Sequence, residues 1–152
     1  SPLLVKISPD SMYEKIRDTV NVAEKYADGI IATNTSTEID ELLEKEVPED
    51  VGGGLSGEPI REISTQTVAT VYDEIEDEIP IIGVGGVSTA EDAFEKIMAG
   101  AEAIQLYTGL IYEGPTVARD INKSLAEILD QKGYDDVSDA VGDENGSYLP
   151  KA

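Results

Sequence analysis

The chain contains neither cysteine nor histidine among its 152 residues. Without cysteine it can form no disulfide and can carry out no thiolate chemistry. Without histidine, a Ser-His-Asp triad and a histidine-based zinc site are both excluded within this chain. There is also no apolar run long enough to cross a bilayer, and Ser1-Pro2 leads directly into a strand-like segment instead of a signal peptide.

Basic side chains are scarce, because 11 lysines and arginines face 32 acids and leave a net charge of −21. Such a surface repels nucleic acid and anionic lipid headgroups, so we expect no nucleic-acid partner. The acids are spread along the whole chain and do not form one acidic tail. This distribution favours a cytoplasmic protein adapted to high salt over a protein that is merely acidic.

The length is that of a single domain, and an apolar content of 40% is typical of a globular protein. Because the chain has no initiator methionine, we expect it to begin inside a longer protein. Strands and helices are predicted to alternate four times. The predicted strands are residues 3–7, 30–34, 80–84 and 103–107.

Each predicted strand is followed by an amphipathic helix. Ser88 and Glu91 are expected to form a capping box at the start of the helix that follows strand 80–84. Strict alternation implies parallel strands with right-handed crossovers, and hence an α/β fold. Two architectures fit, an open doubly wound sheet and one half of an eight-stranded barrel, and periodicity does not choose between them.

Glycines and hydroxyl side chains gather where the last two predicted strands end. Gly85 and Gly86 follow one strand, and Tyr107-Thr108-Gly109 follows the next. Backbone N–H groups at such ends can hold a phosphate, although Gly85-Gly86 could also be a tight strand-to-helix turn. In (β/α)8 barrels the loops after strands 7 and 8 commonly form a phosphate site, which would make these four strands numbers 5 to 8.

Two further polar features lie at the ends of the first two strands. Lys6 stands within an apolar strand, where it either protects a sheet edge from aggregation or reaches an anionic ligand. Asn34 follows the second strand beside Thr33 and Thr35. Its amide could pair with a planar amide-like ring, or the cluster could simply form a turn.

Five blocks of the chain resemble a known family. In order they are "LLVKISPD", "DGIIATNTS", "GGLSGEPIREISTQTV", "IPIIGVGGVSTAEDAFEKIMAGA" and "IQLYTGLIYEGP". They resemble the C-terminal half of class 2, quinone-linked dihydroorotate dehydrogenase. The resemblance implies a (β/α)8 TIM barrel of which only strands 5 to 8 are present, with residues 1–133 forming this half barrel and residues 134–152 an acidic tail.

The family oxidises dihydroorotate to orotate in pyrimidine synthesis and passes the electrons through flavin mononucleotide (FMN) to a quinone. The resemblance implies that Asn34 and Thr35 bind the substrate and that the other matching residues bind FMN. The implied FMN-binding residues are Lys6, Thr33, Gly57, Gly85, Gly86, Tyr107 and Thr108. Lys6 would stabilise the negative charge of the reduced ring, and Tyr107 and Thr108 would complete the phosphate cup.

The first half of the family's barrel has no counterpart in this chain. The resemblance places the serine base and the helices that meet membrane and quinone in that missing part, so we expect no catalytic base here and an inactive isolated fragment. The intact enzyme is expected to be a monomer on the cytoplasmic side of the membrane. The alternatives are a non-catalytic FMN- or phosphate-binding half-barrel module and another phosphate-binding TIM-barrel enzyme.

Overall fold

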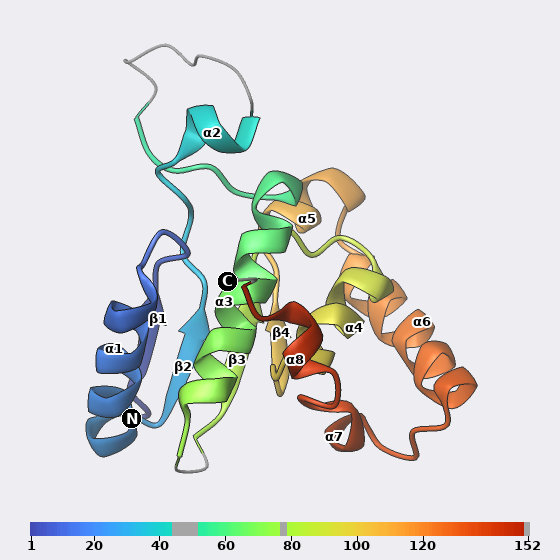
Figure 1. Ribbon diagram of the computed structural model, residues 1–152. Helices are drawn as coiled ribbons and strands as arrows, with labels where there is room; N and C mark the ends of the chain where they lie inside the picture. The colour runs from blue at the N-terminus through green and yellow to red at the C-terminus, as the bar shows by residue number, and fades with distance from the viewer. Residues whose placement is uncertain (44–51, 77–78, 151–152) are drawn as a thin grey trace.

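A parallel four-stranded sheet runs through the protein, as seen in a computed structural model that describes residues 1–43, 52–76 and 79–150 (Figure 1). The strands lie side by side in chain order. They are β1 (Leu4–Ile7), β2 (Gly29–Ala32), β3 (Ile81–Val84) and β4 (Ala103–Gln105). The register pairs Lys6 with Ile31 and Ile31 with Ile82, so the four carboxyl ends meet at one edge of the sheet.

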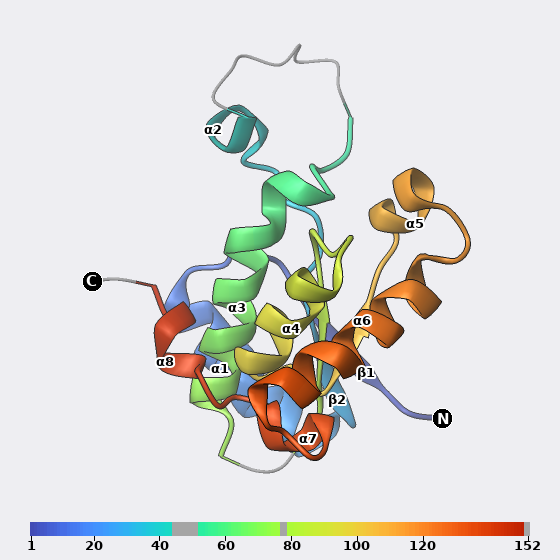
Figure 2. The same cartoon turned by 90° about the vertical axis from the view of Figure 1, so that its right-hand side faces the viewer.

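The helices connect and flank these strands. The two longest early helices are α1 (Tyr13–Tyr26) and α3 (Arg61–Glu74), and α3 is preceded by a 3₁₀ turn at Glu58–Ile60. The remaining helices are α2 (Ile39–Leu43), α4 (Ala90–Met98), α5 (Thr108–Glu113), α6 (Val117–Lys132), α7 (Val137–Ala140) and α8 (Asn145–Tyr148). Helices α1, α3 and α4 lie on the same face of the sheet (Figures 1 and 2).

The core lies between that face and the helices. Short apolar strands alternate their side chains between the two faces, which sends Ile7, Ile30 and Ile81 into contact with the helices. From the helix side, Val20 of α1 and Val68 of α3 complete this cluster and are fully buried. Burial of these side chains supplies the main driving force that holds the helices on the sheet.

The opposite face of the sheet is uncovered by any described helix. Leu4 is 39% exposed there, Lys6 is also exposed, and Ile31 and Ile82 are only half-buried. A doubly wound sheet carries helices on both faces, whereas the wall of a barrel carries them on one face only. The sequential strand order and the single helical layer therefore confirm the predicted half barrel and exclude the doubly wound arrangement.

Several boundaries differ from the sequence-based prediction. The capping-box prediction was wrong by one residue, because Thr89 is the N-cap of α4 and its side chain pairs with Asp92 instead of Glu91. Helix α5 was not predicted, since its residues had been assigned to the end of a strand and a loop. Helix α6 ends at Lys132, and its C-cap is Gly133, whose φ of 84° lies in the left-handed region that glycine adopts readily.

Residues after Gly133 pack against the helical layer. Phe94 of α4 lies 6.3 Å from Tyr134, measured between ring centroids, and the two rings share a cluster with Ala140 of α7. The amide of Asn145 donates hydrogen bonds to the carbonyl oxygens of Ala69 and Ala99, at 2.8 and 3.0 Å. The division between a half barrel and an acidic tail at residue 133 stays a prediction, and the described part of that tail is tied to α3 and α4.

Candidate functional site

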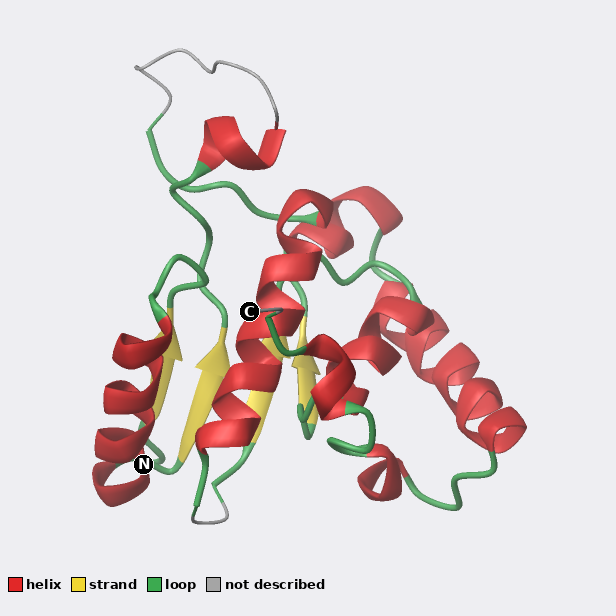
Figure 3. Ribbon diagram, in the orientation of Figure 1, coloured by secondary structure: helices red, strands yellow, loops and turns green. Residues whose placement is uncertain are grey.

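A cavity of about 270 Å³ opens at the carboxyl ends of the four strands, the edge at which the arrows point toward the loops in Figure 3. Parallel sheets bind their ligands at this edge. Every residue that the sequence assigned to cofactor or substrate lines this one cavity. These residues are Lys6, Thr33, Asn34, Thr35, Gly57, Gly85, Gly86, Tyr107 and Thr108. Their individual roles stay predictions, but the fold brings all nine together.

Lys6 projects from β1 on the uncovered face of the sheet. It pairs in register with Ile31, and its side chain is exposed at the border of the cavity. Among the residues that the structure describes, no carboxylate forms a salt bridge with it. An ammonium group so placed is available to a ligand that carries negative charge in the cavity.

The main chain after β2 is held by both neighbouring strands. The N–H of Thr33 donates to the carbonyl oxygen of Val84 at 2.8 Å, and the N–H of Asn34 donates to that of Ile7 at the same distance. Thr33 is buried, whereas Asn34 and Thr35 are exposed at the cavity. The side chains of Asn34 and Thr35 are therefore free to meet a ligand while their backbone is fixed.

Asp10 organises the same loop, a role that was not foreseen from the sequence. Its carboxylate accepts hydrogen bonds from the Ser36 hydroxyl at 2.5 Å and from the N–H and hydroxyl of Thr37 at 2.7 and 2.9 Å. Burial raises the pKa of Asp10, but the hydrogen bonds from Ser36 and Thr37 outweigh it and leave that pKa below its ordinary value. In the sequence, Asp10 is simply an aspartate shortly before a predicted helix. Aspartates are common at such positions, so the pattern does not predict this role.

A second tie joins this loop to the glycine-rich segment. Ser36 and Leu55 exchange two backbone hydrogen bonds, at 3.0 and 2.7 Å. Beyond that bridge, the Thr108 hydroxyl donates to the Ser56 hydroxyl at 2.9 Å. Segments that are distant in the sequence thus form the continuous rim of the cavity, and residues 44–51 of the same connection lie outside the described part.

The glycines after β3 are required by neighbouring protein atoms. Gly85 and Gly86 have φ angles of 123° and 69°. A Cβ atom on Gly86 would lie 2.4 Å from the Cβ of Arg61, and one on Gly85 would lie 2.9 Å from that of Ser64. The first turn of α3 therefore fills the space that side chains would need, and the backbone of the turn is pressed between α3 and the cavity.

The ends of β3 and β4 lie in direct contact. A Cβ atom on Gly109 would lie 2.3 Å from the carbonyl oxygen of Val87, so the two turns pack backbone against backbone. Within residues 1–43, 52–76 and 79–150, no acceptor takes a hydrogen bond from the N–H of Gly86, Val87, Thr108 or Gly109. Free donors at two adjoining strand ends suit an anionic group such as a phosphate.

An internal carboxylate, that of Asp92, lies at the start of α4. The Asp92 carboxylate accepts from the N–H groups of Ser88 and Thr89, at 3.0 and 2.9 Å, and forms a salt bridge of 2.8 Å with Arg61. Burial raises the pKa of Asp92, yet the hydrogen bonds from Ser88, Arg61 and Thr89 hold it below its ordinary value. The N–H groups of Ser88 and Thr89, which directly precede α4, are thus occupied by an internal carboxylate.

Two other classes of site lack support in the part of the chain that the structure describes. There, no cluster of three or more acidic side chains is arranged to hold a metal ion. No described helix combines the length and the apolar character needed to cross a bilayer.

Comparison with known proteins adds a family to this geometry. Residues 1–129 match the family model described as dihydroorotate dehydrogenase. A Halobacterium salinarum protein named dihydroorotate dehydrogenase (quinone) is 52% identical over 143 residues, which cover 93% of this chain and 40% of that protein. A Synechocystis protein of the same name is 48% identical over 157 residues, covering 99% of this chain and 41% of the relative.

A solved structure agrees with these sequence matches. The ligand-free DHODH of Eimeria tenella superposes with a TM-score of 0.84 and 42% sequence identity, covering 93% of this chain and 39% of that one. The chain thus spans about 40% of the length of the relatives that it matches. Halophilic archaea provide several of these relatives, in agreement with the acidic composition.

Proposed function

The chain belongs to the dihydroorotate dehydrogenase family, and we propose that it forms the cofactor-phosphate site and part of the substrate site of a quinone-dependent enzyme that oxidises dihydroorotate to orotate in pyrimidine synthesis. One observation carries the proposal. Nine residues chosen from the ends of four strands, and from the loop before α3, line a single cavity. We further propose that an upstream half barrel covers the bare face of the sheet in the complete enzyme.

The family is flavin-dependent, and FMN is the flavin that we propose for this site. The donors that suit its phosphate are the N–H groups of Gly86, Val87, Thr108 and Gly109, which have no described protein acceptor. When bound, the flavin supplies the acceptor for the hydride of the substrate and passes the electrons to the quinone.

In this proposal the residues of this chain bind and orient the flavin and the substrate. The ammonium of Lys6 stabilises negative charge that develops on the ring system beside it. Asn34 offers one amide donor and one acceptor to the pyrimidine of dihydroorotate, and Thr35 offers a hydroxyl. Rigid backbone ties from Thr33 and Asn34 to β3 and β1 keep these groups in place between turnovers.

The remaining parts of the reaction are assigned to the upstream part of the complete enzyme. Removal of a proton from the substrate carbon needs a positioned base, and we propose a serine in that part of the protein. The same part is proposed to contact the membrane and the quinone, with the enzyme monomeric and peripheral on the cytoplasmic side.

The test uses the full-length protein that carries this chain. We expect it to purify with FMN in equimolar amount and to form orotate from dihydroorotate when a soluble quinone is present. Lys6→Ala is expected to lower kcat by about 10²-fold, in the range measured for loss of one group that stabilises developing charge. Lys15→Ala, which removes an exposed lysine of α1, is the matched control and should leave kcat unchanged.

The outcomes separate the proposal from its alternatives. A protein that binds FMN but forms no orotate would be a flavin-binding module without this activity. A protein that purifies without flavin and binds none would contradict the proposal altogether. Equal loss of activity in Lys6→Ala and Lys15→Ala would remove the role assigned to Lys6.

A further inference from the structure

A lysine is buried directly behind the glycine turn that follows β3. Lys96 of α4 is 0% exposed and is the largest of the fully buried side chains. Its Nζ donates to the Ser64 hydroxyl at 2.6 Å, to the Thr65 hydroxyl at 2.9 Å and to the carbonyl oxygen of Arg61 at 3.5 Å. These three acceptors all belong to the first turns of α3.

The charge of Lys96 has no partner carboxylate at salt-bridge distance within the described part of the chain. Burial of an ammonium group among neutral acceptors costs stability that an apolar side chain of similar size would not cost. The fold nevertheless makes space for it, since a Cβ atom on Gly83 would lie 3.2 Å from Cδ of Lys96. A costly group that the packing accommodates in this way calls for a function.

The hydrogen bonds of Lys96 have a fixed direction. An ammonium only donates, so the Ser64 oxygen must accept from Nζ and must give its own proton to another acceptor. Two acceptors lie at 2.9 Å, the carbonyl oxygens of Gly85 and Arg61. A protonated Lys96 thus keeps the Ser64 proton on the side of these carbonyls, and one of them belongs to the glycine turn.

The orientation of the Gly85 carbonyl decides where the next N–H points. The Gly85–Gly86 peptide is trans and planar, so its C=O and N–H point in opposite directions. With the oxygen held toward Ser64, the N–H of Gly86 points away from the core, and Gly86 lines the cavity on that side. Two hydrogen bonds, from Lys96 to Ser64 and from Ser64 to Gly85, therefore connect Lys96 to the peptide whose N–H is a donor of the proposed phosphate site.

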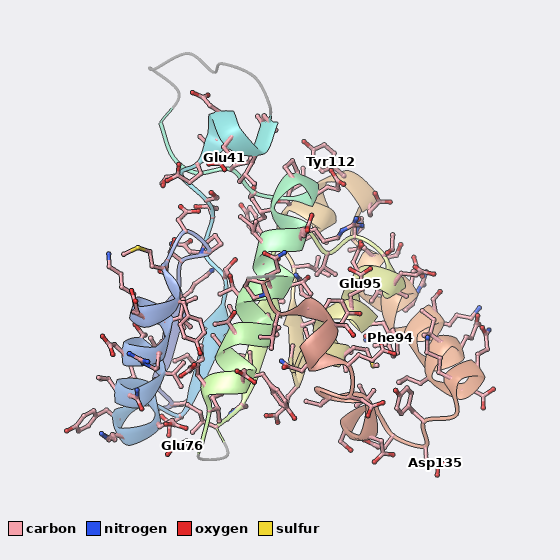
Figure 4. All side chains as sticks on the ribbon, in the orientation of Figure 1. Glu41, Glu76, Phe94, Glu95, Tyr112 and Asp135 are labelled. Atoms are coloured by element: carbon pink, nitrogen blue, oxygen red, sulfur yellow. The ribbon has the colours of Figure 1, made fainter. Side chains whose placement is uncertain are left out.

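The surroundings of Lys96 bring its pKa close to neutral pH. Burial lowers the pKa of Lys96, Asp92 and Glu95 of α4 raise it, and Arg61 of α3 lowers it, with the net result that this pKa falls from 10.5 to about 7. Glu95 lies on the outer side of α4, toward α8 (Figure 4). The strand packed against Lys96, β3, contributes glycine at position 83 and no titratable group. A dianion placed beyond the Gly85–Gly86 peptide would favour the charged form of this lysine.

We propose that Lys96 is a positioning residue for the phosphate of the flavin: as an ammonium it holds Ser64, and through Ser64 it fixes the Gly85–Gly86 peptide with its N–H toward the phosphate. This inference rests on the proposed function and deepens it. Its consequence is that phosphate binding and protonation of Lys96 are coupled, so binding of FMN near neutral pH is accompanied by uptake of a proton.

The experiment compares FMN with riboflavin, which has the same ring and no phosphate. Both are titrated into the full-length protein after removal of bound flavin, by calorimetry and flavin fluorescence. Lys96→Met keeps an apolar stem and removes the charge. We expect it to weaken FMN binding by about 10-fold or more and to leave riboflavin binding unchanged, because only the phosphate is held by the peptide. Lys123→Met, on the exposed face of α6, is the matched control for the loss of one charge.

Ser64→Ala provides a second variant that keeps the charge and breaks the chain of hydrogen bonds. It is expected to weaken FMN binding in the same phosphate-specific manner, and it tests the proposal if Lys96→Met does not fold. In the wild type, the ratio of FMN affinity to riboflavin affinity should decrease as pH rises from about 6.5 to about 8.5, compared with the same ratio in Lys96→Met. This pH range is chosen around the Lys96 pKa of about 7. Calorimetry in buffers of different ionisation enthalpy should detect the proton uptake at pH 7.5, a value within that range.

Three results would overturn the inference and leave the proposed function in place. Equal weakening of FMN and riboflavin would show a general structural role, and no weakening of either would show no role at all. A pH profile of the affinity ratio that is the same in wild type and Lys96→Met would remove the coupling. A wild-type protein that binds neither flavin would instead overturn the proposed function, and the inference with it.

Discussion

At the end of β3, two different contacts could explain why positions 85 and 86 are glycine. The sequence suggested that Gly85 and Gly86 lack side chains so that a ligand can approach the backbone. In the structure, the space beside them is filled by Ser64 and Arg61 of α3. The glycines thus let α3 press against the turn, and the ligand-facing side is left to the N–H groups.

Gly86 provides a residue-scale prediction, with Gly133 as its matched control. Both have positive φ, 69° and 84°, but a Cβ atom on Gly133 would meet no atom within 4 Å, whereas one on Gly86 would meet Arg61 at 2.4 Å. We expect Gly133→Ala to lower the free energy of unfolding by about 1 kcal/mol, from backbone strain alone. Gly86→Ala should cost more, by about 1–3 kcal/mol, because overpacking is added to that strain.

Chemical denaturation of the two variants of the full-length protein measures this difference. Equal destabilisation would mean that the contact with Arg61 relaxes freely and that strain is the whole effect. We also expect Gly86→Ala, and not Gly133→Ala, to weaken FMN binding, since only Gly86 lines the cavity.

At the scale of elements, the start of α4 depends on a compact set of hydrogen bonds. The Thr89 side chain accepts from the N–H of Asp92 at 3.2 Å, and the Asp92 carboxylate accepts from the N–H of Thr89. Thr89→Ala should lower the free energy of unfolding by about 1 kcal/mol, the usual cost of a lost N-cap. Thr116→Ala is the control, because Thr116 precedes α6 without making a cap hydrogen bond, and it should cost less.

The same cap predicts a pH dependence. The pKa of Asp92 is lower in the folded state than in the unfolded state. Between these two pKa values the unfolded state therefore binds more protons than the folded state. The stability contributed by Asp92 is therefore complete above the unfolded pKa of 3.8 and is lost progressively below it. Asp92→Asn should flatten this part of the stability profile. An unchanged acid limb in that variant would contradict the assignment.

The elements themselves followed from local patterns to different degrees. The four strands and the helices α1, α3, α4 and α6 were foreseen, because apolar spacing and the flanking glycines and prolines act within each segment. Helix α5 was missed, since Thr108–Glu113 has neither a cap nor a clear apolar stripe, and Tyr112 at its outer end is 82% exposed (Figure 4). The capping box was displaced by one residue because Ser88 and Thr89 are both competent caps.

For the whole molecule, the net charge of −21 predicts a strong salt dependence of stability. Repulsion among exposed carboxylates favours the expanded chain, and screening shortens its range from about 10 Å at 0.1 M salt to about 3 Å at 1 M. The midpoint of thermal unfolding should therefore rise between low and multimolar potassium chloride. Sucrose at matched osmolality is the control for effects other than screening, and an equal rise in sucrose would contradict the electrostatic explanation.

The sequence by itself determined the periodic order of strands and helices, and with it the edge at which the polar strand ends meet. Parallel strands align their carboxyl ends, so Lys6, Asn34, Gly85 and Thr108 had to gather once the alternation was known. Tertiary structure alone decided what stands behind them. The ties of Asp10 to Ser36 and of Lys96 to Ser64 join segments more than twenty residues apart. Such pairings depend on how separate elements pack, and local apolar spacing carries no record of them.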